Sequence, residues 1–232
     1  MRVTIVTPTY NERENISKLV PAIFSLKISG LSVIVVDDNS PDGTADVVRE
    51  LSHRYSVRVL HRAKKMGIGS AYVAGMSAAI QNGAEAIFEM DADFSHDPQD
   101  LPRMLETLNK CDVVIGSRKI AGGKIIGWGW IRQAMSSGAM WFSRKILGLK
   151  THDVTAGFRC FRAEVLKNIN IGSIQSNGYA FQEELLYRVE QKGYRVTEIP
   201  VTFVDRQLGK SKLSKKDIIE FFIRMTELRF LK

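Results

Sequence analysis

Two carboxylates one residue apart follow a short apolar run near the middle of the chain. The run spans residues 86–90, and Asp91, Ala92 and Asp93 come directly after it. Carboxylates with this spacing on irregular backbone can turn toward one hard divalent cation, which usually keeps phosphate oxygens among its other ligands. Because Asp is also common in the turns that follow strands, an ordinary turn is the alternative interpretation. The pair indicates a candidate site for a metal ion and a phosphorylated substrate.

Two earlier loops carry residues that could hold a nucleoside. Tyr10 and Glu12 follow the first apolar run, which Pro8 is expected to end, and an aromatic ring and a carboxylate in a loop could hold a base and its ribose. Asp37 and Asp38 follow the second run, where a carboxylate is well placed to accept hydrogen bonds from a nucleoside. Capping of the helix after the first loop is the alternative for that segment.

The elements that must position these residues alternate between strands and helices. Short β-branched or apolar runs are separated by longer stretches with helical periodicity, which predicts parallel strands joined by right-handed crossovers. A doubly wound α/β sheet of the nucleotide-binding type follows from this alternation. The expected strands are 3–6, 32–36, 57–60, 86–90 and 113–115, and the expected helices are 14–25, 44–54, 68–81 and 98–109.

The second half of the chain follows a different pattern. A glycine-rich stretch at 121–129 precedes a helix expected at 131–147, and an irregular region comes after it. Residues 217–232 place Phe221, Met225 and Leu228 at helical spacing among basic side chains. This pattern predicts either a helix that packs on the core or one that lies at a membrane surface.

Composition narrows the class of protein. The chain has 232 residues, of which 44% are hydrophobic, and its formal net charge of +8 suits nucleic acid, an anionic membrane surface or phosphorylated substrates. Cys111 and Cys160 have no metal-ligand spacing, so we expect a reducing, cytoplasmic setting. We expect neither a signal peptide nor a membrane span, because no apolar run approaches about 20 residues.

Seven segments, in order and over nearly the whole chain, carry a resemblance to a known family. The segments are PTYNERENI, VVDDNSPDGT, EMDADFSHDP, VIGSR, DVTAGFRCF, GYAFQEEL and FVDRQLGKSKL. With these segments the chain resembles the glycosyltransferases of family 2 with the GT-A fold, and within them the dolichol-phosphate (polyprenyl-phosphate) mannosyltransferases. The resemblance implies a mostly parallel central sheet flanked by helices, a catalytic domain at 1–212 and an amphipathic, membrane-proximal helix at 213–232.

The resemblance also implies an activity and its partners. It is the transfer of mannose from GDP-mannose to dolichyl or another polyprenyl phosphate, with inversion at the anomeric carbon and with Mg2+ or Mn2+. The enzyme would act at the cytoplasmic face of a membrane, which it would reach by its own surface or through a membrane-anchoring subunit. A donor such as UDP-glucose remains the alternative, because the base-contacting residues do not separate guanine from uracil.

Carried over onto this sequence, the resemblance assigns roles to residues. Asp91 and Asp93 would bind the metal, and together with Arg118 they would form the catalytic set. The residues expected to bind the donor are Pro8, Tyr10, Glu12, Val36, Asp38, Asp91, Ala92, Asp93, Arg206 and Lys212.

The acceptor phosphate is expected to meet cations and a hydroxyl. A phosphomonoester is already ionised near neutral pH, since its second pKa is about 6, so we predict that no side chain is needed to remove a proton. Arg118, Arg132 and Ser136 are the candidates, because a guanidinium matches phosphate oxygens in a bidentate way and residues four apart share a helix face. A solvated surface cation is the alternative for each arginine.

Other residues are expected to support the site indirectly. His96 lies near Asp93 in the sequence, while Asp153, Gln182 and Glu184 fall in family-like segments and could shape or brace a sugar pocket. A nucleic-acid-binding protein is the alternative from another class, but the chain has no basic-aromatic repeat or recognised motif. We therefore expect no nucleic-acid partner.

Overall fold

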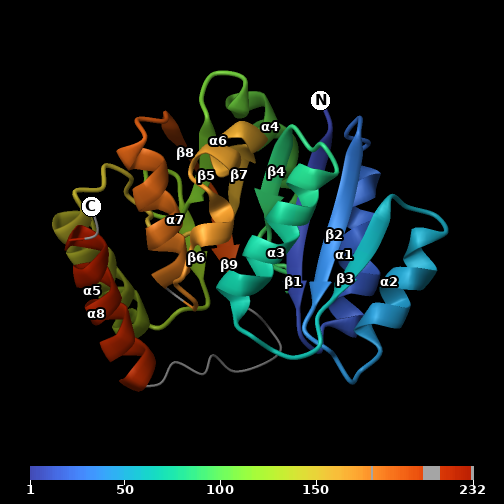
Figure 1. Cartoon of the computed structure of the whole chain (residues 1–232), viewed down its shortest axis with the longest axis horizontal. Coiled ribbons are helices and arrows are strands. Elements are labelled where there is room, and N and C mark those ends of the chain that lie inside the picture. Colours follow the sequence, from blue (N-terminus) through green and yellow to red (C-terminus); the bar gives the residue numbers. More distant parts are fainter. Residues whose placement is uncertain (179, 206–214, 231–232) are drawn as a thin grey trace.

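A seven-stranded sheet forms the centre of the molecule (Figure 1). The structure, a computed structural model, describes residues 1–178, 180–205 and 215–230, with the backbone alone for 215–220. All strands of this sheet except β7 run parallel. In order across the sheet the strands are β3 (Val57–His61), β2 (Leu31–Asp37), β1 (Val3–Thr9), β4 (Ala86–Glu89), β7 (Arg159–Arg162), β5 (Val113–Ser117) and β8 (Val196–Pro200).

Helices cover both faces of the sheet, so the predicted α/β fold with a mostly parallel sheet is confirmed. Val33 and Val35 of β2 pack in one apolar cluster with α1, α2 and α4, while Ile34 and Val36 pack in the other with α3, α6 and α7. Burial on both faces explains the near-continuous apolar runs of the strands. The helices are α1 (Arg13–Ser25), α2 (Thr44–Ser52), α3 (Ile68–Gln81), α4 (Leu101–Leu108), α5 (Trp130–Leu147), α6 (Ala163–Asn168), α7 (Ala180–Gln191) and α8 (Lys215–Phe230), with 3-10 turns η1 (Pro98–Asp100) and η2 (Ile171–Ser173).

Helix α3 lies unusually close to the sheet. A Cβ atom added at Gly75 would be 2.3 Å from Cγ1 of Val6 and 2.8 Å from Cγ2 of Val36. The absence of a side chain at Gly75 therefore allows α3 to approach β1 and β2 this closely.

The first strand is longer than the sequence indicated, and the expectation that Pro8 ends it is wrong. Strand β1 continues to Thr9, and Pro8 pairs in register with Val36 of β2. The carbonyl of Val6 points toward β4 and accepts a hydrogen bond from the Met90 amide. Backbone groups two residues apart on a strand point the same way, so the backbone nitrogen of Pro8 also points toward β4. Because the pairing of β1 with β4 ends at Val6, no ladder hydrogen bond needs the amide proton that proline lacks.

The C-terminal helix packs on the same core as the rest of the chain. Phe221, Met225 and Leu228 of α8 are buried in the cluster that contains α7, and α8 lies beside α5 at one end of the sheet (Figure 1). A second, two-stranded parallel sheet lies nearby, formed by β6 (Lys124–Ile126) and β9 (Thr202–Val204). Within the described ranges, no helix is both long and apolar enough to span a bilayer.

Candidate functional site

One edge of the sheet collects the segments that the sequence singled out. The parallel strands β2, β1, β4 and β5 all end at this edge, which is the lower one in Figure 1. Strand β7 runs the opposite way, so the segment before it, residues 151–158, arrives at the same edge. The loops after four strands and before a fifth therefore meet at one edge, which carries Tyr10, Asp38, Asp91 and Arg118 among the described residues.

Asp91 and Asp93 lie half-buried just past the end of β4. The Tyr72 hydroxyl donates to Oδ1 of Asp91 at 2.8 Å, and the Ser95 amide donates to Oδ1 of Asp93 at 3.0 Å. The Asp91 amide in turn donates to Nδ1 of His96 at 3.1 Å. With buried Ala92 between them, both carboxylates are thus fixed through side-chain and backbone contacts.

The two side chains behind this pair are neutral. Burial, reinforced by the charges of Asp91 and Glu89, raises the pKa of Tyr72 well above its usual value. Burial lowers the pKa of His96, although the nearby aspartate charges oppose that shift. His96 stacks on Phe158 with ring centroids 4.9 Å apart, which holds the imidazole in place. Tyr72 therefore remains a hydrogen-bond donor, and neutral His96 accepts through Nδ1.

The carboxylate pair fits the predicted divalent cation. Among the residues that the structure describes, no three His, Cys, Asp or Glu side chains form a complete metal-binding group. Two half-buried carboxylates after a strand match a cation such as Mg2+, which usually takes one or two protein carboxylates and completes its shell with waters and phosphate oxygens. Asp91 and Asp93 are therefore suited to hold a metal together with a bound diphosphate.

The loop after β1 offers an aromatic surface. Tyr10 is 41% exposed, and Nζ of Lys65 lies 4.4 Å from its ring centroid. The Glu12 carboxylate accepts a hydrogen bond from the side chain of Asn15 at 2.7 Å. Pro8 is half-buried within β1 itself. The exposed ring of Tyr10 provides a flat face on which a nucleotide base could stack.

The loop after β2 holds a buried ion pair. Asp38 accepts two hydrogen bonds from Arg62, at 2.5 Å from Nε and 2.8 Å from Nη2, and Nη1 of Arg62 donates to Ser70 at 2.8 Å. Val36 is buried in the core, where its carbonyl accepts from the Thr9 hydroxyl at 3.3 Å. A nucleoside at this place would meet a carboxylate whose charge is already balanced by a guanidinium.

A second buried carboxylate and arginine lie beneath the Asp91 loop. Oε2 of Glu89 is 4.0 Å from Nε of Arg159, and both side chains are fully buried. Arg159 directs its donors to the carbonyls of Val154, Ala156 and Gln182 instead. Burial raises the pKa of Glu89 to about 8, although the charge of Arg159 opposes that shift. Glu89 is therefore mostly protonated at neutral pH.

The loop after β5 directs Arg118 toward Asp153 from the segment before β7. Nε and Nη2 of Arg118 donate to the two oxygens of Asp153 at 2.8 and 2.6 Å, and Nη2 also donates to Thr155. Burial favours a higher pKa for Asp153, but its hydrogen bonds and ion pair with Arg118 outweigh that effect and hold the pKa below its usual value. Asp153 is therefore ionised, and it fixes the direction of the Arg118 side chain.

Trp128 brings the two predicted acceptor arginines together. The guanidinium carbon of Arg118 lies 5.7 Å from the Trp128 ring centroid, and that of Arg132 lies 4.0 Å from the same centroid. Nη1 of Arg132 also pairs with Asp205 at 2.7 Å. Ser136 lies half-buried one turn further along α5. Trp128 thus contacts one arginine from the turn after β5 and one from α5.

The sequence did not indicate Arg62 or Tyr72 as parts of the site, and two predicted residues are not among those described. Arg206 and Lys212 lie outside the described residues. Arg62 follows β3, so the rule that selected Asp38 and Asp91 could have found it, whereas Tyr72 lies within a helix and carried no such signal. Glu184 braces α7 against α8, because it accepts a hydrogen bond from Arg224 at 3.2 Å.

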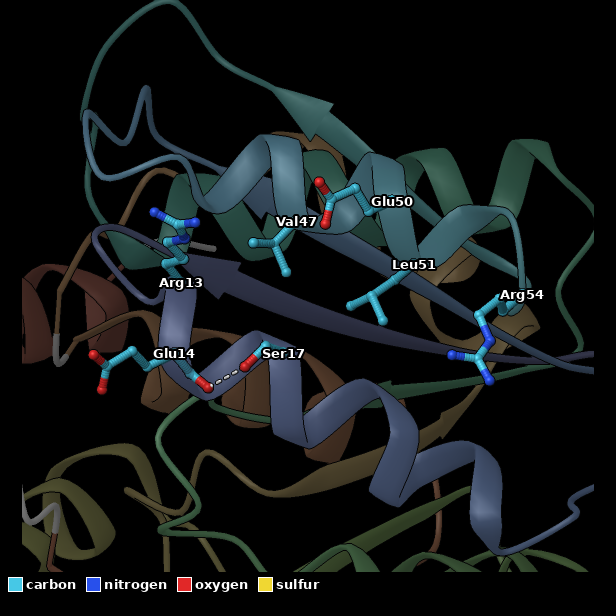
Figure 2. Close-up of a pocket in the computed structure, with 7 residues that line it drawn as sticks. All are labelled: Arg13, Glu14, Ser17, Val47, Glu50, Leu51 and Arg54. Atoms are coloured by element: carbon cyan, nitrogen blue, oxygen red, sulfur yellow. Dashed lines mark hydrogen bonds between the residues drawn. The ribbon is translucent and has the colours of Figure 1, made fainter.

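A separate hollow lies on the outer surface. It measures about 430 Å³ and runs between α1 and α2, away from the Asp91 loop. Figure 2 shows residues of α1 facing residues of α2 across it, with Arg54 just past the end of α2. None of the residues that line it belongs to the predicted site. The lining residues are Arg13, Glu14, Ser17, Val47, Glu50, Leu51 and Arg54.

Comparison with known sequences identifies relatives over almost the whole chain. A model of the family described as "Glycosyl transferase family 2" matches residues 4–169. A protein of Micrococcus luteus named undecaprenyl-phosphate mannosyltransferase is 41% identical over 97% of this chain and 93% of its own length. A protein of Mycolicibacterium smegmatis named polyprenol monophosphomannose synthase is 41% identical over 97% of this chain and 86% of its own length.

Comparison with solved structures confirms the predicted GT-A fold. Glucosyl-3-phosphoglycerate synthase from Mycobacterium tuberculosis, solved with Mn2+, UDP and phosphoglyceric acid, aligns with a TM-score of 0.72 at 18% identity, over 100% of this chain and 79% of its own. A mannosyltransferase from Pyrobaculum calidifontis, solved with GDP-Man and Mn2+, aligns with a TM-score of 0.62 at 16% identity, over 99% of this chain and 70% of its own. At these identities the likeness establishes the fold alone.

Proposed function

The chain belongs to glycosyl transferase family 2, and from this premise we propose that this glycosyltransferase moves mannose from GDP-mannose to the phosphate of a polyprenyl lipid such as dolichyl phosphate. The names of the two relatives at 41% identity support both mannose and a polyprenyl phosphate. The Pyrobaculum calidifontis neighbour binds GDP-Man on the same fold, which makes GDP-mannose the first donor to test.

The observation that carries the proposal is the arrangement of polar side chains along one sheet edge, where two carboxylates gather after one strand and two arginines gather after another. Asp91 and Asp93 follow β4, while Arg118 follows β5 and shares Trp128 with Arg132. Strand β7 lies between these two halves of the edge. A diphosphate bridged by a metal suits the carboxylate half, and a phosphomonoester suits the arginine half. A sugar bound between them would lie between its leaving group and its acceptor.

The reaction follows from the charges of the two substrates. An oxygen of the lipid phosphate attacks the anomeric carbon of mannose, the bond from that carbon to the diphosphate breaks, and GDP leaves with the electron pair, so the configuration inverts. Because the acceptor is already ionised, no carboxylate has to take its proton. Asp153 is consistent with this, since it is occupied by Arg118 and holds its orientation.

The donor side is assigned on the same basis. Asp91 and Asp93 would hold Mg2+ or Mn2+, which supplies Lewis-acid stabilisation of the departing diphosphate. Tyr10, Glu12 and Asp38, with Pro8 and Val36 beneath them, would border the nucleoside. Arg206 and Lys212 are proposed to close over the donor.

A membrane surface is the proposed location of the acceptor. Trp130, Ile131, Met135 and Trp141 of α5 are each more than half exposed, and Ile223 of α8 is 54% exposed. Exposed indole and aliphatic side chains on neighbouring helices suit the interfacial region of a bilayer. The arginine half of the site is continuous with α5 through Arg132, which lies on that helix. We propose that the enzyme acts peripherally, at the cytoplasmic face of a membrane.

A transfer assay with radiolabelled GDP-mannose and dolichyl phosphate tests the proposal. Label should pass to the lipid in the presence of Mn2+, and EDTA should reduce transfer by about 1,000-fold, as expected when several kcal/mol of stabilisation are lost. Asp93→Asn should have a similar effect. Asp97→Asn is the matched control, because Asp97 is exposed, caps η1, and Asn also caps well.

The same assay distinguishes the alternatives. Turnover of UDP-glucose without turnover of GDP-mannose would refute the mannose donor while leaving the lipid phosphate acceptor intact. Full activity in EDTA would refute the role of Asp91 and Asp93 as metal ligands.

A further inference from the structure

Two neighbouring cations in the turn after β5 have different partners. Arg118 is paired with Asp153, and its side chain is only 8% exposed. Lys119 is half-buried, and its Nζ donates to Oγ of Ser137 at 3.2 Å. Ser137 lies on α5, the helix that also carries Arg132. The chain returns tightly against this turn, since a Cβ on Gly123 would be 2.7 Å from the carbonyl carbon of Arg118.

The charge balance of the acceptor half singles out Lys119. Arg118 is paired with Asp153, and Arg132 is paired with Asp205, so each guanidinium already has a carboxylate. Among the side chains that the structure describes, no carboxylate lies within 4.0 Å of Nζ of Lys119. A phosphomonoester carries about two negative charges above its second pKa. Two neutralised arginines are a weak match for that charge, and Lys119 supplies a further positive charge that, among the described side chains, is in direct contact with no carboxylate.

The surroundings of Lys119 also favour an anion. Burial lowers the pKa of Lys119, the charge of Asp153 opposes this, and the charge of Arg118 adds to it. An ammonium that has lost part of its hydration gains more from a phosphate than a fully solvated one does. The Ser137 hydroxyl beside it could accept from Lys119 and donate to a phosphate oxygen at the same time.

We propose that the Lys119 ammonium and the Ser137 hydroxyl bind the phosphate of the polyprenyl acceptor, beside Arg118 and Arg132. The assignment rests on the proposed function, because it names two further residues at the same acceptor site. General attraction of a lysine to an anionic membrane is the competing explanation, and the experiment must separate the two.

Calorimetric titration with farnesyl phosphate, a short-chain prenyl monophosphate, tests the assignment without any transfer step. Lys119→Met should weaken binding about 10- to 100-fold, as expected for a lost hydrogen bond to a charged group. Ser137→Ala should weaken it a few-fold, and Lys119→Arg should retain most of the affinity. Lys124→Met is the matched control, because Lys124 is an exposed lysine on nearby β6. GDP-mannose affinity should be the same in all variants.

Each outcome decides the assignment. Equal affinity of Lys119→Met and the unsubstituted protein for farnesyl phosphate would overturn it, and so would equal weakening by Lys124→Met. A loss of binding to phosphatidylglycerol vesicles as large as the loss for farnesyl phosphate would show general membrane attraction instead. If farnesyl phosphate binds and depends on Lys119 but no mannose is transferred, the proposed function fails and the phosphate site stands. Absence of binding by the unsubstituted protein would refute both.

Discussion

Two buried pairs of a carboxyl group and an arginine lie behind the two halves of the site. The carboxyl group is protonated in one pair and ionised in the other. Glu89 lies 4.0 Å from Arg159, which spends its donors on backbone carbonyls, and burial raises the pKa of Glu89 to about 8. Asp153 receives a bidentate contact from Arg118, and its pKa is below the usual value despite equal burial. Direct hydrogen bonds from a guanidinium keep Asp153 ionised, whereas a guanidinium 4.0 Å away does not keep Glu89 so.

The difference suits the two halves of the edge. Behind Asp91, the described partners Tyr72, His96 and Glu89 are neutral near pH 7, so the negative charge at the surface is available to a cation. Behind Arg118, an ionised Asp153 orients the guanidinium. The carboxylate after β4 thus depends on neutral hydrogen-bonding partners, whereas Arg118 and Arg132 depend on ion pairs.

The largest expected effect comes from breaking the ionised pair. Asp153→Asn should reduce the free energy of unfolding by about 3–5 kcal/mol, because Arg118 would remain buried without a counter-charge. Urea unfolding at pH 7 measures this change. The double variant Asp153→Leu with Arg118→Met should regain much of the stability while transfer stays low, and a double variant as unstable as the single one would contradict the explanation.

The neutral partner of the metal site gives the next largest effect. Tyr72→Phe removes the hydroxyl that donates to Asp91 and should raise the Mn2+ concentration needed for half-maximal transfer about 10- to 100-fold. Tyr55→Phe is the control, since Tyr55 stacks on Phe24 away from this edge. An unchanged metal requirement in Tyr72→Phe would show that the Asp91 carboxylate is positioned by its backbone alone.

The raised pKa of Glu89 predicts a pH dependence of stability. Between the usual pKa of 4.5 and the folded value of about 8, the unfolded chain releases the Glu89 proton and the folded chain keeps it, so stability falls as pH rises. The contribution is about 1.4 kcal/mol per pH unit. Glu89→Gln should therefore gain stability relative to the unsubstituted protein from pH 5 to pH 8 in urea unfolding. Glu164→Gln on α6 is the exposed control, and a constant difference across this range would contradict the buried, protonated state.

The smallest effect is expected at the partly exposed pair. Asp205→Asn should change the free energy of unfolding by less than about 1 kcal/mol, because the Arg132 side chain is 41% exposed and water screens the pair. Urea unfolding at two salt concentrations checks this. A loss as large as that in Asp153→Asn would mean that Arg132 depends on Asp205 as strongly as Arg118 depends on Asp153.

The first half of the fold was predictable because its signals are local. The alternation of apolar runs and helical patterns placed five strands within about three residues of β1 to β5, and the predicted helix 68–81 coincides with α3. The second half was not predictable in the same way. Strands β7 and β8 lie in the region that reads as irregular, and the antiparallel position of β7 depends on pairing with β4 and β5, which are distant from it in the sequence.

The candidate site shows the same difference between local signals and long-range contacts. The sequence by itself determined that Asp38 and Asp91 lie at the sheet edge, since a carboxylate after an apolar run reaches that edge in any fold of this class. Only the tertiary structure decided which charges are neutralised: that Asp38 is paired with Arg62, that Trp128 unites Arg118 and Arg132, and that Lys119 has no carboxylate beside it among the described side chains. The physical reason is that charge state depends on burial and on partners brought from distant segments, which no local pattern contains.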